Sequence, residues 1–302
     1  MQLFTDFRYV ESARAVEGAE LVETKRDLIA ALADLLSGRV GFEAAHLSYA
    51  WYKTLSAAGL ELVPRHGLVE ALRAVKDARE LDVIRRAAAI TSTAFERLAG
   101  EQFVGRSERD LAWRMNELLH EAGADRPAFD ALVGAGENSA RPHAHPGDRV
   151  IGSGETVVVD AGAKLDGYCS DCTRTFATGG VSDELAHAYE VCLEAQRAAV
   201  EATCAGAGGK EVDAVARGII ARAGLGEKFG HGLGHGVGVE VHEAPRMADS
   251  SADTLAPGNV VTVEPGIYLE GTGGIRIEDL AVVTDGEAEV LTTAARELVG
   301  VA

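Results

Sequence analysis

Residues 157–176 read VVVDAGAKLDGYCSDCTRTF, and residues 261–280 read VTVEPGIYLEGTGGIRIEDL. Both segments open with a V-x-V run that ends in an acid and a Pro or Ala followed by Gly, and both have the residue pattern of a β-hairpin. Each carries two carboxylates that such a hairpin would direct toward one point. The four carboxylates are Asp160, Asp171, Glu264 and Glu278.

Between these hairpins lies a histidine-rich segment, residues 230–243, which reads GHGLGHGVGVEVHE and contains His231, His235 and His242. Four carboxylates in one pocket cannot all stay ionised without compensation, because like charges and burial raise their pKa values. A pair of divalent cations removes that conflict. The pattern therefore predicts a metal site, with carboxylates that suit Mn²⁺ and an imidazole that also admits Co²⁺, Fe²⁺ or Zn²⁺.

Strand periodicity assigns some of these residues to faces. In the second hairpin Arg276 and Glu278 share one face, because side chains alternate along a strand. In the first hairpin Asp171 shares a face with Cys169 and Thr173. By the same alternation, we expect Glu243 and Asp279, which adjoin candidate ligands, to point away from the metals.

Other interpretations of these motifs are weaker. The Gly-rich histidine segment could be a flexible loop, but it is not a phosphate-binding loop, because no Lys-Ser/Thr follows and it opens no helix. Cys169 and Cys172 form a C-x-x-C motif, which can indicate zinc or redox chemistry. Since there is no second pair, we do not expect a zinc site there.

The chain from residue 76 onward has two similar halves, a weak internal duplication visible in pattern only. Residues 76–176 and residues 182–284 each run helix, helix, β-hairpin. We expect helices at 76–100, 107–123, 182–203 and 210–223, and a short strand at 129–133. The pattern predicts an α+β fold in which a pseudo-twofold brings both hairpins to one site.

Residues 1–70 have a different character and show no visible chemistry. Their apolar spacing predicts a small α/β region with strands at 7–10, 40–42 and 60–63 and helices at 23–36 and 48–58.

The bulk composition is that of a globular protein, with 47% hydrophobic and 25% charged residues. The formal net charge of −18 argues against nucleic acid or an anionic membrane as a partner. No apolar run reaches the roughly 18 residues of a membrane helix, and the N-terminus lacks signal-peptide features. Four cysteines are few for 302 residues, so we expect a reduced, cytoplasmic protein.

In combination, these segments make the chain resemble the pita-bread metallopeptidase family, which includes methionine aminopeptidase, prolidase and aminopeptidase P. The resemblance covers residues 70–295 and includes PHAHPGDR, the two acidic hairpins and FGHGLGHGVGVEVHEAP. It implies a pita-bread (creatinase/aminopeptidase) fold and two divalent metal ions. The implied ligands are Asp160, Asp171, His235, Glu264 and Glu278, with Asp171 and Glu278 bridging the ions.

The resemblance also implies roles for other side chains. His143 and His242 would lie near the scissile peptide and act in catalysis with Glu264, which serves as general base and metal ligand. His231 would line the proline side, and Arg276 would support the substrate-binding network. The residues of the PHAHPGDR and VHEAP motifs resemble the proline-specific branch of the family more than methionine aminopeptidase. The implied activity is hydrolysis of the Xaa-Pro bond at a peptide N-terminus, by an aminopeptidase P or a prolidase acting as a homodimer.

The N-terminal segments LFTDFRYVESA and VGFE with LSYAWY resemble the second half of a creatinase-like N-terminal domain. We therefore expect a truncated domain at 1–70 and a catalytic pita-bread domain at 71–302.

Three alternatives stay open. The chain could be a creatinase-like hydrolase that needs no metal, a catalytically inactive pita-bread protein used for binding, or a methionine aminopeptidase. Retention of all five ligand-type residues argues against the first two. The sequence leaves open the native metal, the residue preferred before proline, and the choice between dipeptides and longer peptides.

Overall fold

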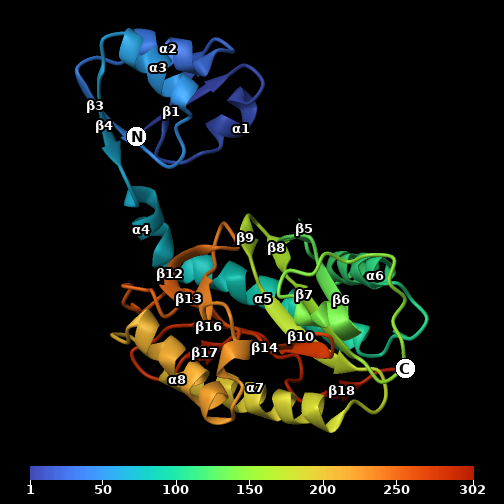
Figure 1. The fold of residues 1–302 in the computed structure, drawn as a ribbon. Helices are drawn as coiled ribbons and strands as arrows, with labels where there is room; N and C mark the ends of the chain where they lie inside the picture. The colour runs from blue at the N-terminus through green and yellow to red at the C-terminus, as the bar shows by residue number, and fades with distance from the viewer. The chain divides into compact units, whose positions relative to one another are not determined.

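The computed structural model describes all 302 residues, which form two compact units, Met1–Val69 and Glu70–Ala302 (Figure 1). No helix combines the length and the apolar composition that crossing a lipid bilayer requires.

The first unit contains two parallel strand pairs. β1 (Gln2–Asp6) pairs with β2 (Glu20–Thr24), and β3 (Arg39–Glu43) pairs with β4 (Glu61–Arg65). Parallel neighbours need a crossover connection, and helices lie in the crossovers of both pairs. The helices of this unit are α1 (Val10–Arg14), α2 (Leu28–Leu35) and α3 (Tyr49–Ala57).

The predicted strand at 7–10 is wrong. The strand ends at Asp6, whose carboxylate accepts hydrogen bonds from the backbone and guanidinium of Arg8, and whose carbonyl accepts from the Tyr9 amide at 3.0 Å. These local polar contacts turn the chain and start α1 at Val10, against the β preference of the aromatic residues. The predicted helix at 23–36 begins only at Leu28, because its first residues belong to β2.

The second unit has two halves, each with two helices and antiparallel strands, which confirms the predicted α+β arrangement. The helices are α5 (Ala78–Leu98) and α6 (Glu108–Glu121) in the first half, and α7 (Asp183–Ala202) and α8 (Gly209–Arg222) in the second. Side chains at the N-terminus fix where three of them begin: Asp77 and Glu80 form a capping box on α5, Ser107 caps α6 and Ser182 caps α7. The short α4 (Leu68–Ala74) precedes them.

Two larger sheets carry the candidate site. One has the strand order β18-β10-β7-β6 and the other β12-β11-β13-β16-β17. The strands of the first are β6 (Leu132–Ala135), β7 (Thr156–Ala161), β10 (Cys172–Ala177) and β18 (Val299–Gly300). The strands of the second are β11 (Gly234–Gly236), β12 (Glu243–Met247), β13 (Val260–Val263), β16 (Asp279–Val282) and β17 (Glu289–Val290).

Smaller elements complete the unit. They are β5 (Arg126–Pro127), β8 (Ala163–Leu165), β9 (Tyr168–Cys169), β14 (Gly266–Leu269), β15 (Gly273–Arg276) and the 3-10 helices η1 (Gly136–Ala140) and η2 (Gly226–Lys228). The two predicted hairpins are therefore built from β7 to β10 and from β13 to β16. The short strand predicted at 129–133 is β6, shifted toward the C-terminus.

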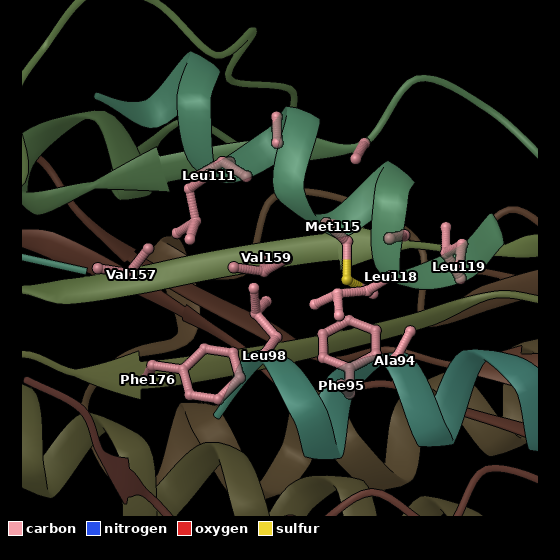
Figure 2. Packing of buried hydrophobic residues seen from close by; sticks show 14 of the residues in the cluster. Ala94, Phe95, Leu98, Leu111, Met115, Leu118, Leu119, Val157, Val159 and Phe176 are labelled. Atoms are coloured by element: carbon pink, nitrogen blue, oxygen red, sulfur yellow. The ribbon is translucent and has the colours of Figure 1, made fainter. Parts of the chain in front are cut away.

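Each half has its own apolar core. In the first half, Phe95 and Leu98 of α5 and Met115 of α6 pack around Val159 of β7, as Figure 2 shows. In the second half, α7 and α8 contact one another and cover the inner strands, with Val261 and Ile275 fully buried. These cores hold the strands that end in the candidate acids, so the positions of the carboxylates follow from the packing of the two halves.

Candidate metal centre

The carboxylates of the first half come from the β7–β10 pair. Asp160 lies near the end of β7, opposite Thr173 of β10, and Asp171 immediately precedes β10. The chain between them makes a close approach at Gly162, where a Cβ would lie 1.9 Å from the carbonyl oxygen of Ser170. Only a glycine allows this approach, which brings the two aspartates to the same end of the pair.

The carboxylates of the second half flank the β14–β15 hairpin. Glu264 follows β13, and Glu278 precedes β16. The two halves meet at Glu278, whose amide donates to the carbonyl of Thr173 at 3.1 Å and whose Oε2 accepts from Thr173 Oγ1 at 2.7 Å. Glu278 is therefore held against the strand that follows Asp171.

His235 in β11 joins the two sets of acids. Its Nε2 lies 3.3 Å from Glu264 Oε1 and 3.8 Å from Asp171 Oδ2. Its Nδ1 lies 3.0 Å from the carbonyl oxygen of Gly236, which can only accept a hydrogen bond. Nδ1 therefore carries a proton, and Nε2 faces the acids in the orientation that a metal-binding histidine needs.

The electrostatics of this group are those of a site built for cations. Burial, and then the charges of neighbouring acids, raise the pKa values of Asp171 and Glu278 well above the ordinary range. Burial also raises the pKa of Asp160 and outweighs the opposing charge of Arg276. Burial works against ionisation of Glu264 too, but its hydrogen bond with His235 lowers its pKa to about 2.

The residues present fit divalent metal ions. One donor atom each of Asp171, His235 and Glu278 lie within 4.8 Å of one another. Oδ1 of Asp160 and Oδ1 of Asp171 are buried and have no hydrogen-bond partner in the protein, an arrangement that costs free energy unless a cation supplies the partner. Carboxylate oxygens with one imidazole nitrogen form a donor set for Mn²⁺, Co²⁺, Fe²⁺ or Zn²⁺.

Arg276 is buried beside the acids, and its guanidinium donates to four protein atoms. Its Nη2 contacts Asp160 Oδ2 at 2.6 Å, and its Nη1 contacts the Pro142 carbonyl at 3.0 Å and the Tyr268 hydroxyl at 3.2 Å. Its Nε donates to Thr173 Oγ1 at 3.1 Å. The guanidinium thus orients one candidate ligand and ties it to the loop that carries His143.

The acids open into a cavity of about 820 Å³. Its lining includes all five predicted ligands, and also His143, His231, His242 and Arg276. The ring of His242 lies 4.2 Å from that of His235. His231 Nε2 lies 2.9 Å from the Tyr268 hydroxyl, and its ring contacts Phe229 edge-on. The structure thus brings every predicted site residue to one cavity, while their individual roles stay predictions.

The neighbouring acids that we expected to point away have other partners. The carboxylate of Glu243 binds Arg73 and Lys76, the latter at 3.1 Å. Asp279 binds Arg174 at 2.8 Å. The cysteines of the C-x-x-C motif are free and buried.

Sequence reasoning missed other residues of this cavity or its wall, among them a tyrosine and two arginines. Tyr268 bridges His231 and Arg276, and Arg73 lies in the lining although it comes from the helix α4. Arg246 also lines the cavity. The strand alternation of residues 243–247 could have indicated Arg246, but its partner strand was not identifiable without the register.

A two-halved α+β unit, with carboxylates and one imidazole gathered between the halves, is the arrangement of a candidate metal-binding protein. The profile described as Metallopeptidase family M24 matches residues 82–285, and the profile described as Creatinase/Prolidase N-terminal domain matches residues 2–75. The chain belongs to metallopeptidase family M24, and its second unit has the pita-bread fold.

Several relatives are named Xaa-Pro dipeptidases or prolidases, and others are uncharacterized peptidases. An uncharacterized peptidase, YqhT, of Bacillus subtilis is 42% identical, covering 98% of this chain and 86% of its own. The Xaa-Pro dipeptidase of Pyrococcus horikoshii is 41% identical, over 77% of this chain and 66% of its own. The solved structure of an Xaa-Pro dipeptidase from Bacillus anthracis matches with a TM-score of 0.96 at 41% identity, covering 99% of this chain and 86% of that one.

Proposed function

We propose that this protein hydrolyses the bond between the first residue of a peptide and a proline in second position. The observation that carries the proposal is the meeting of Asp171, His235 and Glu278 within 4.8 Å, in a cavity that His143, His231 and His242 also line. The likeness to Xaa-Pro dipeptidases and to the solved structure of an X-Pro aminopeptidase from Thermotoga maritima supports it.

Two divalent cations, held by Asp160, Asp171, His235, Glu264 and Glu278, would supply Lewis acidity that lowers the pKa of a water molecule and polarises the substrate carbonyl. Mn²⁺ is our first candidate, and Co²⁺, Zn²⁺ and Fe²⁺ are the alternatives. The acidic wall attracts the free α-amino group of the substrate, which is a cation or a hydrogen-bond donor. Binding of this group places the first peptide bond at the site, so that only the first residue is removed.

The chain's own residues handle the proton and the oxyanion. Glu264 lies in the cavity wall, where its Oε1 accepts a hydrogen bond from the Thr262 hydroxyl at 3.1 Å. It takes a proton from the attacking water while the water oxygen bonds to the carbonyl carbon of the substrate. His143 and His242 donate to the oxygen that becomes negative. The proton then passes to the proline nitrogen as the C–N bond breaks, which releases the first amino acid and the prolyl product.

The proposal also covers the cellular compartment, the oligomeric state and the domain organisation of the protein. Four free cysteines fit a reducing compartment, so we place the protein in the cytoplasm. We propose a homodimer, and a creatinase-type domain at 1–70 that is distinct from the catalytic domain at 71–302.

Hydrolysis of Ala-Pro and of Ala-Pro-Ala by the Mn²⁺-loaded protein, against a chelator-treated control, tests the proposal. Metal-dependent release of alanine from at least one peptide is the expected result. Cleavage that survives removal of the metal would favour the creatinase-like alternative. The absence of cleavage from both peptides would favour the inactive binding protein.

A further inference from the structure

Glu108, the first residue of α6, is a fully buried acid that lies outside the candidate metal centre and its cavity. Its carboxylate forms no ion pair. The hydrogen bonds that it accepts all come from one segment, residues 135–147, which we call the His143 loop. Burial of a carboxylate without a cation costs free energy, which hydrogen bonds have to offset. The carboxylate and the loop therefore depend on each other.

The carboxylate joins the two ends of the His143 loop. Its Oε1 accepts a hydrogen bond from the Ala135 amide at 2.9 Å, where the loop begins, and its Oε2 accepts from the Gly147 amide at 3.2 Å, where the loop ends. The side-chain amide of Asn138 donates to both oxygens, at 3.0 Å and 3.2 Å. One buried side chain thus closes the loop at its base.

This anchor is itself held rigidly. Ser107 caps the helix that Glu108 begins, and the N-terminus of a helix favours a negative charge. The amide of Glu108 donates to the Arg149 carbonyl at 3.0 Å, and the amide of Arg109 donates to the Gly147 carbonyl at 3.0 Å. Main chain and side chain of the same helical turn therefore hold the end of the loop.

Consecutive turns connect the base of the loop to its tip. The Arg141 amide donates to the Asn138 carbonyl at 3.0 Å, and the Ala144 amide donates to the Arg141 carbonyl at 3.1 Å. The side chain of His143 at the tip is exposed to the cavity, so apolar packing does not fix its position. Its position therefore depends on the polar anchors of the loop.

The second half of the unit holds the tip from the other side. Arg276 donates to the Pro142 carbonyl at 3.0 Å, next to His143. A hydrogen bond to a developing negative charge depends on distance and angle, and a misplacement of about 1 Å can cost roughly 100-fold in rate. A change at the base of the loop should therefore affect the reaction.

We infer that Glu108 is a positioning residue that sets the place of His143 over the candidate metal centre. The inference rests on the function proposed above, in which His143 donates to the oxyanion. Glu108 itself contacts neither the candidate ligands nor the cavity, and all five candidate ligands come from other segments. Its loss therefore affects the chemical step and leaves metal binding and substrate binding in place.

The first test is kinetic and uses Glu108→Gln in the Mn²⁺-loaded protein, with whichever of Ala-Pro and Ala-Pro-Ala the unmodified protein cleaves faster. Glutamine has the same shape, but every partner of Glu108 is a donor, so the amide nitrogen faces an N–H group and one anchor is lost. We expect kcat to fall about 10- to 100-fold, with KM and Mn²⁺ affinity within about threefold of the unmodified values. Glu137→Gln, which alters an exposed acid of the same loop, is the control and should leave kcat unchanged.

A double-mutant cycle separates positioning from a general structural role. In a His143→Ala protein, the further change Glu108→Gln should lower kcat by less than about threefold, because no imidazole is left to position. An equal loss in both backgrounds would overturn the inference, as would an unchanged kcat in the single variant.

A second measurement follows His143 without relying on activity or metal. In the metal-free protein with ¹⁵N-labelled histidine rings, the signal that His143→Ala removes identifies His143. Glu108→Gln should shift this signal and leave that of His187, an exposed residue of α7, in place. An unmoved His143 signal, or one that moves together with His187, would overturn the inference.

Asn138→Ala keeps the inference testable if thermal unfolding shows that Glu108→Gln does not fold. Asn138 is only partly buried, and its replacement removes the middle anchor, so kcat should fall about 3- to 10-fold with the same dependence on His143. If the unmodified, metal-loaded protein cleaves neither peptide, the proposed function fails. The histidine spectrum then still decides whether Glu108 positions His143.

Discussion

Thr173 and Glu278 connect the two halves of the second unit at the scale of single side chains. The hydroxyl of Thr173 binds both Glu278 Oε2 and Nε of Arg276, and Arg276 in turn holds Asp160. Buried carboxylates in such proximity raise one another's pKa values, and the fold tolerates them because cations can neutralise them.

Replacement of Glu278 by Gln separates metal binding from folding. Removal of one buried charge should weaken Mn²⁺ binding by more than about 100-fold. This loss is larger than the one expected when a residue that only supports a metal ligand is altered. It should not lower the melting temperature of the metal-free protein, since it relieves repulsion among Asp160, Asp171 and Glu264. Calorimetric titration and thermal unfolding measure the two effects.

The control is Glu270→Gln, an exposed acid in the same segment, which should change neither quantity. Unchanged Mn²⁺ affinity in the Glu278→Gln protein would contradict the assignment of Glu278 as a ligand.

Residue identity and spacing predicted which acids and histidines would meet in the cavity, because hairpins with matching patterns deliver their ends to one place. They did not predict that Arg246 would also line it. That residue becomes visible only through its register with His235, and pairing between β11 and β12 is set by tertiary packing.

At the scale of elements, the close approach at Gly162 determines how near Asp160 and Asp171 can lie. The turn between β7 and β8 has no room for a side chain, since Ser170 of the neighbouring segment contacts it directly. Thr91 of α5 supports this region, with its hydroxyl accepting from the Ala163 amide at 2.9 Å.

Gly162→Ala should therefore spread the first hairpin and weaken metal binding, because the clash is with main-chain atoms that cannot move alone. We expect a loss of stability of about 1–3 kcal/mol, typical of overpacking, together with reduced Mn²⁺ affinity. Gly180→Ala is the matched control, because a Cβ there meets nothing within 4 Å. Denaturant unfolding and metal titration that are identical for both variants would refute this account.

Helices of the second unit were predictable from apolar periodicity and caps, as Ser107 and Ser182 show. In the first unit, the strands predicted at 40–42 and 60–63 correspond to β3 and β4, whereas the strand predicted at 7–10 is wrong and β2 was missed. The aromatic residues after Asp6 have β preference, but the Asp6–Arg8 contact turns the chain, and β2 pairs only with a parallel partner distant in sequence.

At the scale of the whole molecule, the chain is two compact units whose stabilities need not depend on pH in the same way. In the first unit, the side-chain hydrogen bond from Arg8 lowers the pKa of Asp6 from 3.8 to about 2. The folded state thus favours the ionised form. This stabilisation is present above pH 3.8 and is lost as the pH falls through about 2.

Asp6→Asn should accordingly accelerate hydrogen exchange in β1 and β2 at pH 6, while leaving the strands of the second unit unchanged. The difference from the unmodified protein should shrink as the pH approaches 2, where Asp6 is protonated in both states. Hydrogen exchange followed by mass spectrometry across this pH range is the measurement. A difference that stays constant down to pH 2 would show that the charge of Asp6 is not responsible.

The division into two halves with a shared centre followed from the repeated helix, helix, hairpin pattern, and the structure confirms it. The sequence could not show how the apolar core of each half packs. Both cores are built from residues distant in sequence, such as Phe95 with Phe176 and Tyr189 with Ile275. The chemistry at their junction depends on that packing.

The central claim is that this junction binds two metal ions and uses them for Xaa-Pro hydrolysis. Stepwise addition of Mn²⁺ to chelator-treated protein, with bound metal and Ala-Pro hydrolysis measured on the same samples, tests it most directly. The account predicts no activity without metal and a rate that rises with occupancy until two ions are bound per chain. Full activity in metal-free protein, or an Mn²⁺ affinity that is unchanged in the Glu278→Gln variant, would contradict it.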